Sequence, residues 1–220
     1  MSSRRSRWAK GIVSGGLGLL ITLALGCGLT SNLINVVKGP KLKAEFDGLE
    51  GKRVAVVCVS NASSYGPNTI CSLLERSVGA ILQQEVEDID MIQTDEVADW
   101  IDNNGWDQTD YREIGRGVDA EMVLAIDLDG LRLHEGRTLY KGRADVVVTV
   151  YDMTDGGKVA FRKEMFDFAF PRSGARHTTE ISEGSFRRLF VTVLAKSVAK
   201  YFHEYHIEED FASDALLLGR

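Results

Sequence analysis

The segment Lys52–Ser60 reads KRVAVVCVS, and it constrains the fold more than any other stretch of the chain. It is a continuous apolar run of strand length and is rich in valine. Such a run is typical of a strand that is buried on both faces of a sheet. We therefore expect a sheet on which helices are packed, which is an α/β arrangement.

Helical periodicity follows this strand. An apolar stripe predicts a helix that Asn68 or Thr69 caps; its members are Ile70, Leu73, Leu74, Val78, Ile81 and Leu82. Residues 88–93 predict a short strand. A second helix is expected from Thr94 to about Asn104, and a short third helix from Thr109 or Asp110.

The C-terminal half reads as a meander of strands and a final helix. Strands are expected over 121–133, 139–151 and 158–170, with an Asp-Gly turn at 154–157. The alternation of the last strand changes phase at Lys163 and Glu164, which predicts a bulge there. A long helix is expected from Ser182 to about Tyr205. The predicted fold is α/β (α+β): one mixed sheet with a C-terminal hairpin meander and packed helices.

The N-terminus carries the signature of a lipoprotein signal peptide. Four basic residues precede an apolar run, and Leu23-Ala24-Leu25-Gly26 leads directly into Cys27. We interpret Cys27 as the lipidated residue and Gly28 after it as favouring the outer membrane. An uncleaved membrane helix within the uncharged stretch 11–37 is the alternative, although glycine and polar residues dilute it.

These segments predict four regions: a signal peptide at 1–26, a tether at 27–50, a globular domain at 51–206 and a loose tail at 207–220. The whole chain has a formal charge of −6. Removal of residues 1–26 lowers the number of Lys and Arg residues from 26 to 22, against 32 Asp and Glu, which leaves −10. An acidic domain argues against nucleic acid as a partner, and membrane attachment is expected through the lipid.

Two cysteines remain in the domain, Cys58 and Cys71. In an oxidising compartment they could pair as a disulfide. The other interpretation is that both are small buried apolar residues, because free cysteine is commonly buried.

Candidate chemistry is sparse. Asp127 and Asp129 share one face of a strand and could form an acid pair, or simply belong to a solvated face. The loop 61–68 lies between a strand and a helix, where phosphate can bind, but it lacks the glycine spacing of a phosphate loop.

Other polar residues lack the neighbours that catalysis or metal binding needs. Ser63 and Ser64 are not in a nucleophile elbow. His203 and His206 could bind a metal from one helical turn, but nothing completes a ligand set. His134 and His177 have no evident partner. No catalytic residue, metal site or cofactor is therefore predicted.

Three stretches together resemble a family of bacterial envelope domains: the first strand with Asn61-Ala62-Ser63, the strand entry 117–124, and the hairpin 148–161. The set resembles the curli-secretion lipoprotein, the penicillin-binding-protein-activator lipoproteins and the amino-terminal domain of the Tol-Pal periplasmic protein. The resemblance covers most of residues 52–206. It implies an anticodon-binding-like α/β fold and no defined activity.

These observations predict a non-enzymatic, lipid-anchored lipoprotein of the cell envelope, whose periplasm-facing domain binds an envelope protein or associates with itself. Two alternatives stay open. One is an envelope enzyme that uses loop 61–68 or Asp127 and Asp129. The other is a subunit of a ring or channel.

Overall fold

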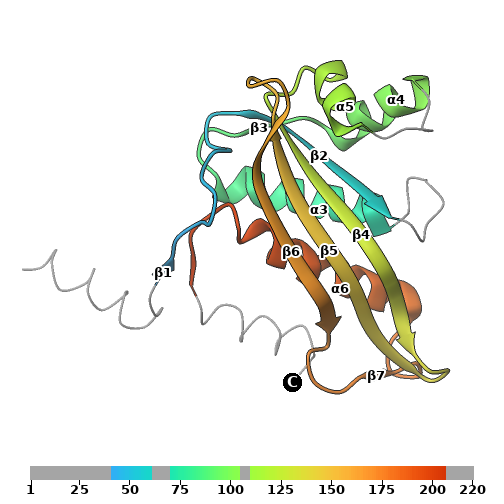
Figure 1. Cartoon of the computed structure of the whole chain (residues 1–220). Helices are drawn as coiled ribbons and strands as arrows, with labels where there is room; N and C mark the ends of the chain where they lie inside the picture. The colour runs from blue at the N-terminus through green and yellow to red at the C-terminus, as the bar shows by residue number, and fades with distance from the viewer. Residues whose placement is uncertain (1–40, 61–69, 105–109, 207–220) are drawn as a thin grey trace, which may run out of the picture.

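The computed structural model describes residues 41–60, 70–104 and 110–206. Their order along the chain is β1 (Lys41–Leu42), β2 (Arg53–Ser60), α3 (Ile70–Glu85), β3 (Asp90–Met91), α4 (Thr94–Asn104), α5 (Tyr111–Gly117), β4 (Met122–Glu135), β5 (Leu139–Asp152), β6 (Lys158–Phe170), β7 (Arg176–His177), α6 (Glu183–Ala199) and β8 (Tyr205–His206) (Figure 1). The predictions for Cys27, the signal peptide, loop 61–68 and the tail 207–220 lie outside the described residues.

The main sheet has the strand order β3-β2-β4-β5-β6, with β7 added to β5. Strand β2 runs parallel to β3 and β4, whereas β4, β5 and β6 form an antiparallel meander. Strands β1 and β8 form a separate two-stranded pair. The predicted α+β class with one mixed sheet and packed helices is confirmed.

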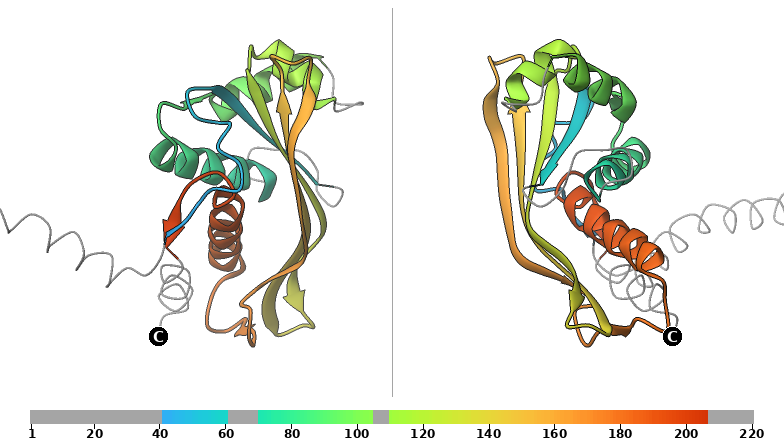
Figure 2. Two further views of the ribbon diagram at one scale, coloured as in Figure 1. Left: turned by 60° about the vertical axis from the view of Figure 1, so that its left-hand side comes forward. Right: turned by 90° about the vertical axis from the view of Figure 1, so that its right-hand side faces the viewer.

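Strand β2 is buried on both faces, as its sequence predicts. Val54, Val56 and Cys58 belong to the larger core with α3 and α6. Ala55 and Val57 belong to a smaller core with α4 and α5. The two views of Figure 2 show α3 and α6 on one side of the sheet and α4 and α5 at one end of its other side.

The meander extends well beyond β2, since β4 and β5 have 14 residues each against 8 in β2. Helix α6 covers the inner face of this extension. The Phe190 ring lies over Gly142 of β5, where an added Cβ would come within 2.0 Å of it. Its neighbour Phe186 stacks on Tyr140, with ring centroids 5.1 Å apart. Aromatic packing therefore holds the last helix to the extension.

One predicted helix boundary is wrong. The last helix ends at Ala199, before the predicted end at Tyr205. Phe202 continues the apolar spacing, but it is buried from the turn after the helix, against Phe46 and Phe161. Leu49, which lies within the predicted tether, is fully buried in the larger core.

The bulge predicted at Lys163 and Glu164 is also misplaced. Both residues pair in regular register with β5, and the irregularities lie on either side, near residues 160 and 166–167. Lys163 lies on the inner face but reaches the rim, where its amine pairs with Glu45 at 2.6 Å and lies over the Tyr201 ring. A long side chain can snorkel in this way, so the alternation breaks without a bulge.

Truncation of Phe190 tests the docking of α6. Phe190→Ala should lower the free energy of unfolding by about 3–5 kcal/mol, because the lost ring leaves a cavity in a close-packed core. Urea denaturation measures this loss. The matched control is Phe166→Ala, whose ring is 72% exposed and whose truncation should change stability by less than about 0.5 kcal/mol. A loss below about 1 kcal/mol for Phe190→Ala would show that the helix does not rely on this contact.

Candidate functional site

The carboxyl end of β2 is the place where polar and reactive side chains gather. Strand β3 has only two residues and pairs with Arg53 and Val54, so the side of β2 beyond them has no neighbouring strand among the described residues. Glu75 of α3 takes that place at Cys58, whose backbone N–H donates to Glu75 Oε1 at 2.7 Å. A side chain thereby satisfies a strand donor that would otherwise be unpaired.

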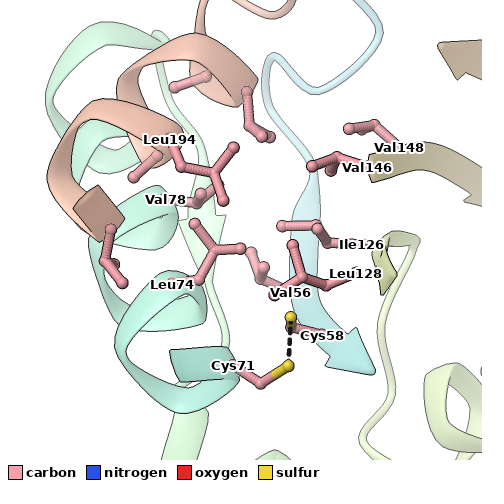
Figure 3. Packing of buried hydrophobic residues seen from close by; sticks show 14 of the residues in the cluster. Val56, Cys58, Cys71, Leu74, Val78, Ile126, Leu128, Val146, Val148 and Leu194 are labelled. Carbon is pink, nitrogen blue, oxygen red and sulfur yellow. Dashed lines mark hydrogen bonds between the residues drawn. The ribbon is translucent and has the colours of Figure 1, made fainter. Parts of the chain in front are cut away.

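The two cysteines lie together at this end of β2. The Cys58 thiol donates to Cys71 Sγ across 2.7 Å, and both thiols are free and buried. Figure 3 shows the pair at the end of the larger core, beside Leu74 and Leu128. Burial, followed by the contact with Cys71, raises the pKa of the Cys58 thiol well above its ordinary value. The structure thus shows the two as buried, adjacent, apolar-packed thiols.

Glu75 is a partly buried carboxyl group with a perturbed pKa. Desolvation raises its pKa to about 7, against the lowering effects of the Cys58 N–H and Arg76. It forms part of the wall of a cavity of about 400 Å³ between α3, β3 and the start of α4, with Val56, Gly79, Met91 and Gln93. A cavity beside a carboxyl group with a raised pKa is a common form of small-ligand site. The basic residue Arg76 also lines this cavity, and its guanidinium pairs with Asp95 at 2.9 Å.

The predicted acid pair lies on the other face of the sheet. Asp127 accepts a hydrogen bond from the Tyr111 hydroxyl of α5. Burial and this contact raise the pKa of Tyr111 well above its ordinary value. Asp129 is exposed and lies opposite Asp145 of β5. The two aspartates share a face, as predicted, but their environments differ: Asp127 is bonded to α5, and Asp129 is exposed on the surface beside Asp145.

The histidines are not brought together. His203 follows the end of α6 and lies 4.0 Å from Glu85, whereas His206 is in β8 opposite Lys41. The prediction that His203 and His206 lie on one helical turn is therefore wrong, because α6 ends at Ala199. His134 lies near Glu183 and His177 in β7 contacts Thr179. Within residues 41–60, 70–104 and 110–206, no group of three His, Cys, Asp or Glu side chains could hold a metal ion.

The extension of the meander has a bare outer face, the face opposite α6. The register places Asp129, Arg132, Arg143, Asp145, Val147, Arg162 and Glu164 on it. In both views of Figure 2 this side of β4, β5 and β6 is uncovered below α5. We call this surface the outer face. Acidic and basic side chains are mixed on it, and Asp129 and Asp145 lie opposite each other on β4 and β5.

The free edge of the outer face is β6, which pairs only with β5 among the described strands. Phe166 lies at the bulge of this strand and is 72% exposed. The next residue, Asp167, has φ of 51°, a left-handed conformation in which aspartate is enriched. Its N–H donates to Asp145 at 2.7 Å and its carboxylate accepts from Arg143 at 2.7 Å. These bonds fix the bulge that exposes Phe166.

The roles of Glu75 and Tyr111 were not predicted from the sequence. Glu75 comes four residues after Cys71 and lies on the same side of the helix as the apolar stripe, which is a detectable signal of a carboxylate near the core. Tyr111 gave no such signal, because its contact with Asp127 depends on where α5 docks.

No protein-family model and no curated protein matches this chain. Solved structures with a similar fold include a PelC dodecamer from Paraburkholderia phytofirmans, which is 16% identical over 75% of this chain and 93% of its own, with a TM-score of 0.42. Lipoprotein GNA1162 from Neisseria meningitidis is 11% identical over 66% of this chain and 97% of its own, with a TM-score of 0.43. The LpoB C-terminal domain from Salmonella enterica is 13% identical over 53% of this chain and 82% of its own, with a TM-score of 0.35.

Similarity at this level carries no functional argument for this chain. The more specific resemblance to the curli-secretion, activator and Tol-Pal domains stays a prediction. In the part of the chain that the structure describes, no helix is long and apolar enough to cross a membrane.

The raised pKa of Glu75 makes stability depend on pH. Its folded pKa of about 7 lies above the unfolded value of about 4.3, so the folded state binds more protons between these values and stability falls as pH rises through them. Glu75→Gln removes this pH-dependent loss of stability, and the glutamine side-chain oxygen can still accept the hydrogen bond from the Cys58 N–H. We expect urea denaturation to show that the variant gains about 2 kcal/mol relative to wild type between pH 5 and pH 8.

The exposed residue Glu87 supplies the control for this experiment. Glu87→Gln should give a stability curve parallel to that of wild type across the same pH range. If the Glu75→Gln curve also runs parallel to wild type, the carboxyl group is not held in the environment described above.

Proposed function

We propose that this protein is a non-enzymatic, lipid-anchored lipoprotein of the cell envelope, whose domain binds an envelope protein or associates with itself through the free β6 edge and the outer face. Anchoring at Cys27 rests on the sequence that surrounds it. The observation that carries the binding role is the exposure of Phe166 on a free strand edge.

The β6 edge has the features of a selective binding strand. An uncovered strand edge is a template for pairing with another chain, and proteins restrict such edges with charges and bulges. Strand β6 carries both, with Arg162, Lys163 and Glu164 between its two irregular positions. An exposed aromatic ring beside them is a typical anchor for a protein interface. The charges disfavour indiscriminate pairing, and Phe166 and the half-exposed Val159 supply apolar contact area.

The charge of the outer face indicates the kind of partner. Asp129 and Asp145, which lie opposite each other on β4 and β5, place two carboxylates side by side on the extension. A partner with a complementary basic surface would associate faster, and the effect would weaken with salt. The proposal is therefore of a partner that presents basic side chains around an apolar pocket for Phe166.

Removal of the lipidation residue tests the anchor. Cells that express the wild-type chain should incorporate labelled fatty acid into it, whereas Cys27→Ala should not be labelled. The reason is that the lipid would be attached to the sulfur atom of Cys27, which alanine lacks. Cys71→Ala is the matched control, because it removes a buried thiol and should leave labelling unchanged. Absence of label on the wild-type chain would refute the anchor and favour the uncleaved helix.

Site-specific photo-crosslinking tests the binding surface. A benzoylphenylalanine at position 166 replaces one exposed aromatic residue with another and should crosslink to a protein in intact cells. The same group at the exposed position Asp102 of α4 is the control and should give little product. The mass of the product distinguishes the two forms of the proposal, since a second copy of this chain doubles the mass and another protein does not. Equal crosslinking at positions 166 and 102 would contradict the proposal that the β6 edge is the binding surface.

A further inference from the structure

The two buried thiols are placed for a covalent bond that the proposed binding role does not use. Cys58 Sγ and Cys71 Sγ lie 2.7 Å apart. A disulfide bond is about 2.05 Å long, so a movement of about 0.7 Å brings the sulfurs to bonding distance. The side chains already point toward each other from β2 and from the first turn of α3, as Figure 3 shows.

We propose that Cys58 and Cys71 are a covalent modification site and form an intrachain disulfide that ties the carboxyl end of β2 to the start of α3.

The oxidant is a disulfide, either that of a thiol–disulfide oxidoreductase or a small molecule such as oxidised glutathione. The Cys71 thiolate attacks one sulfur of the oxidant, whose other sulfur leaves with the bonding electron pair and takes up a proton. Cys58 then loses its proton and attacks Cys71 Sγ in the mixed disulfide, and the second sulfur of the oxidant leaves as a thiol. Two protein thiols become one disulfide, and one oxidant disulfide becomes two thiols.

The environment of the thiols sets the order of these steps. Cys58 is 3% exposed and is the hydrogen-bond donor of the pair, whereas Cys71 is 9% exposed and is the acceptor. Burial raises the pKa of the Cys58 thiol, and the nearby Cys71 and Glu75 raise it further. A thiol with a raised pKa is disfavoured as the first nucleophile. Cys71 is therefore the residue that meets the oxidant, and Cys58 resolves the mixed disulfide.

The bond would stabilise the fold chiefly through the unfolded chain. The two cysteines are 13 residues apart in sequence, and a crosslink over a loop of this length removes chain entropy from the unfolded state. It would join β2, the strand that is buried on both faces, to a helix that covers the larger core.

Peptide mass gives a direct test on the wild-type chain, purified whole in mild detergent without reductant. Trypsin cuts after Arg53 and Arg76, and no lysine or arginine lies between them, so both cysteines fall in the single peptide 54–76. After incubation with oxidised glutathione and alkylation of free thiols under denaturing conditions, we expect this peptide two hydrogen masses lighter than its fully reduced form and not alkylated. Two alkylated cysteines, or glutathione retained on Cys71 without ring closure, would each overturn the proposal.

Thermal unfolding gives a second readout. Reductant should lower the unfolding midpoint of the oxidised wild-type chain by about 6–12 °C. The midpoint of Cys71→Ala, which keeps Cys58 but cannot close the bond, should not respond to reductant. An unchanged wild-type midpoint would contradict the structural role of the bond. Both readouts use an oxidant added in vitro, so their failure is distinguishable from a failure of the anchor at Cys27.

Discussion

Burial of β2 on both faces is the constraint on which the rest of the structure depends. Its alternate side chains enter two separate cores, one under α3 and α6 and the other under α4 and α5. Neither pair of helices can leave without exposing valine side chains to water, at about 25 cal/mol for each Å² of apolar surface. Because helices cover both faces of the sheet at β2, only the long meander beyond it has a face without helices. The outer face is thus a consequence of strand lengths.

The same logic explains how far sequence reasoning reaches. Periodicity predicted the helices and strands because burial on one or both faces leaves a local pattern, as in the alternation of Val146, Val148 and Val150. The pattern failed where a residue was buried outside its element, as with Phe202 after α6, or where a charge lay on an inner face, as with Lys163. Both errors share one cause: a tertiary neighbour, here Phe46 or Glu45, changes what a position requires.

The candidate site was harder to predict than the fold. The shared face of Asp127 and Asp129 follows from strand geometry, and the structure has it. The adjacency of Cys58 and Cys71 needs the crossing of α3 over the end of β2, and the hydrogen bond of Tyr111 to Asp127 needs the docking of α5. Such contacts depend on the relative placement of elements, which one sequence encodes only indirectly. Glu75 is intermediate, since its place beside the apolar stripe indicates burial but not its hydrogen bond to Cys58.

Exposure of Phe166 is maintained by specific bonds, which is the physical basis for placing it at the centre of the proposed binding surface. A regular register would have given β6 an unbroken alternation of inward and outward side chains. Instead Asp167 adopts a left-handed conformation and is bonded to Asp145 through its N–H and to Arg143 through its carboxylate, whose pKa the guanidinium holds below its usual range. Backbone strain of this kind persists only when surrounding contacts fix it. Because the ring stays exposed to water in the folded domain, its apolar surface is left for burial against the proposed partner.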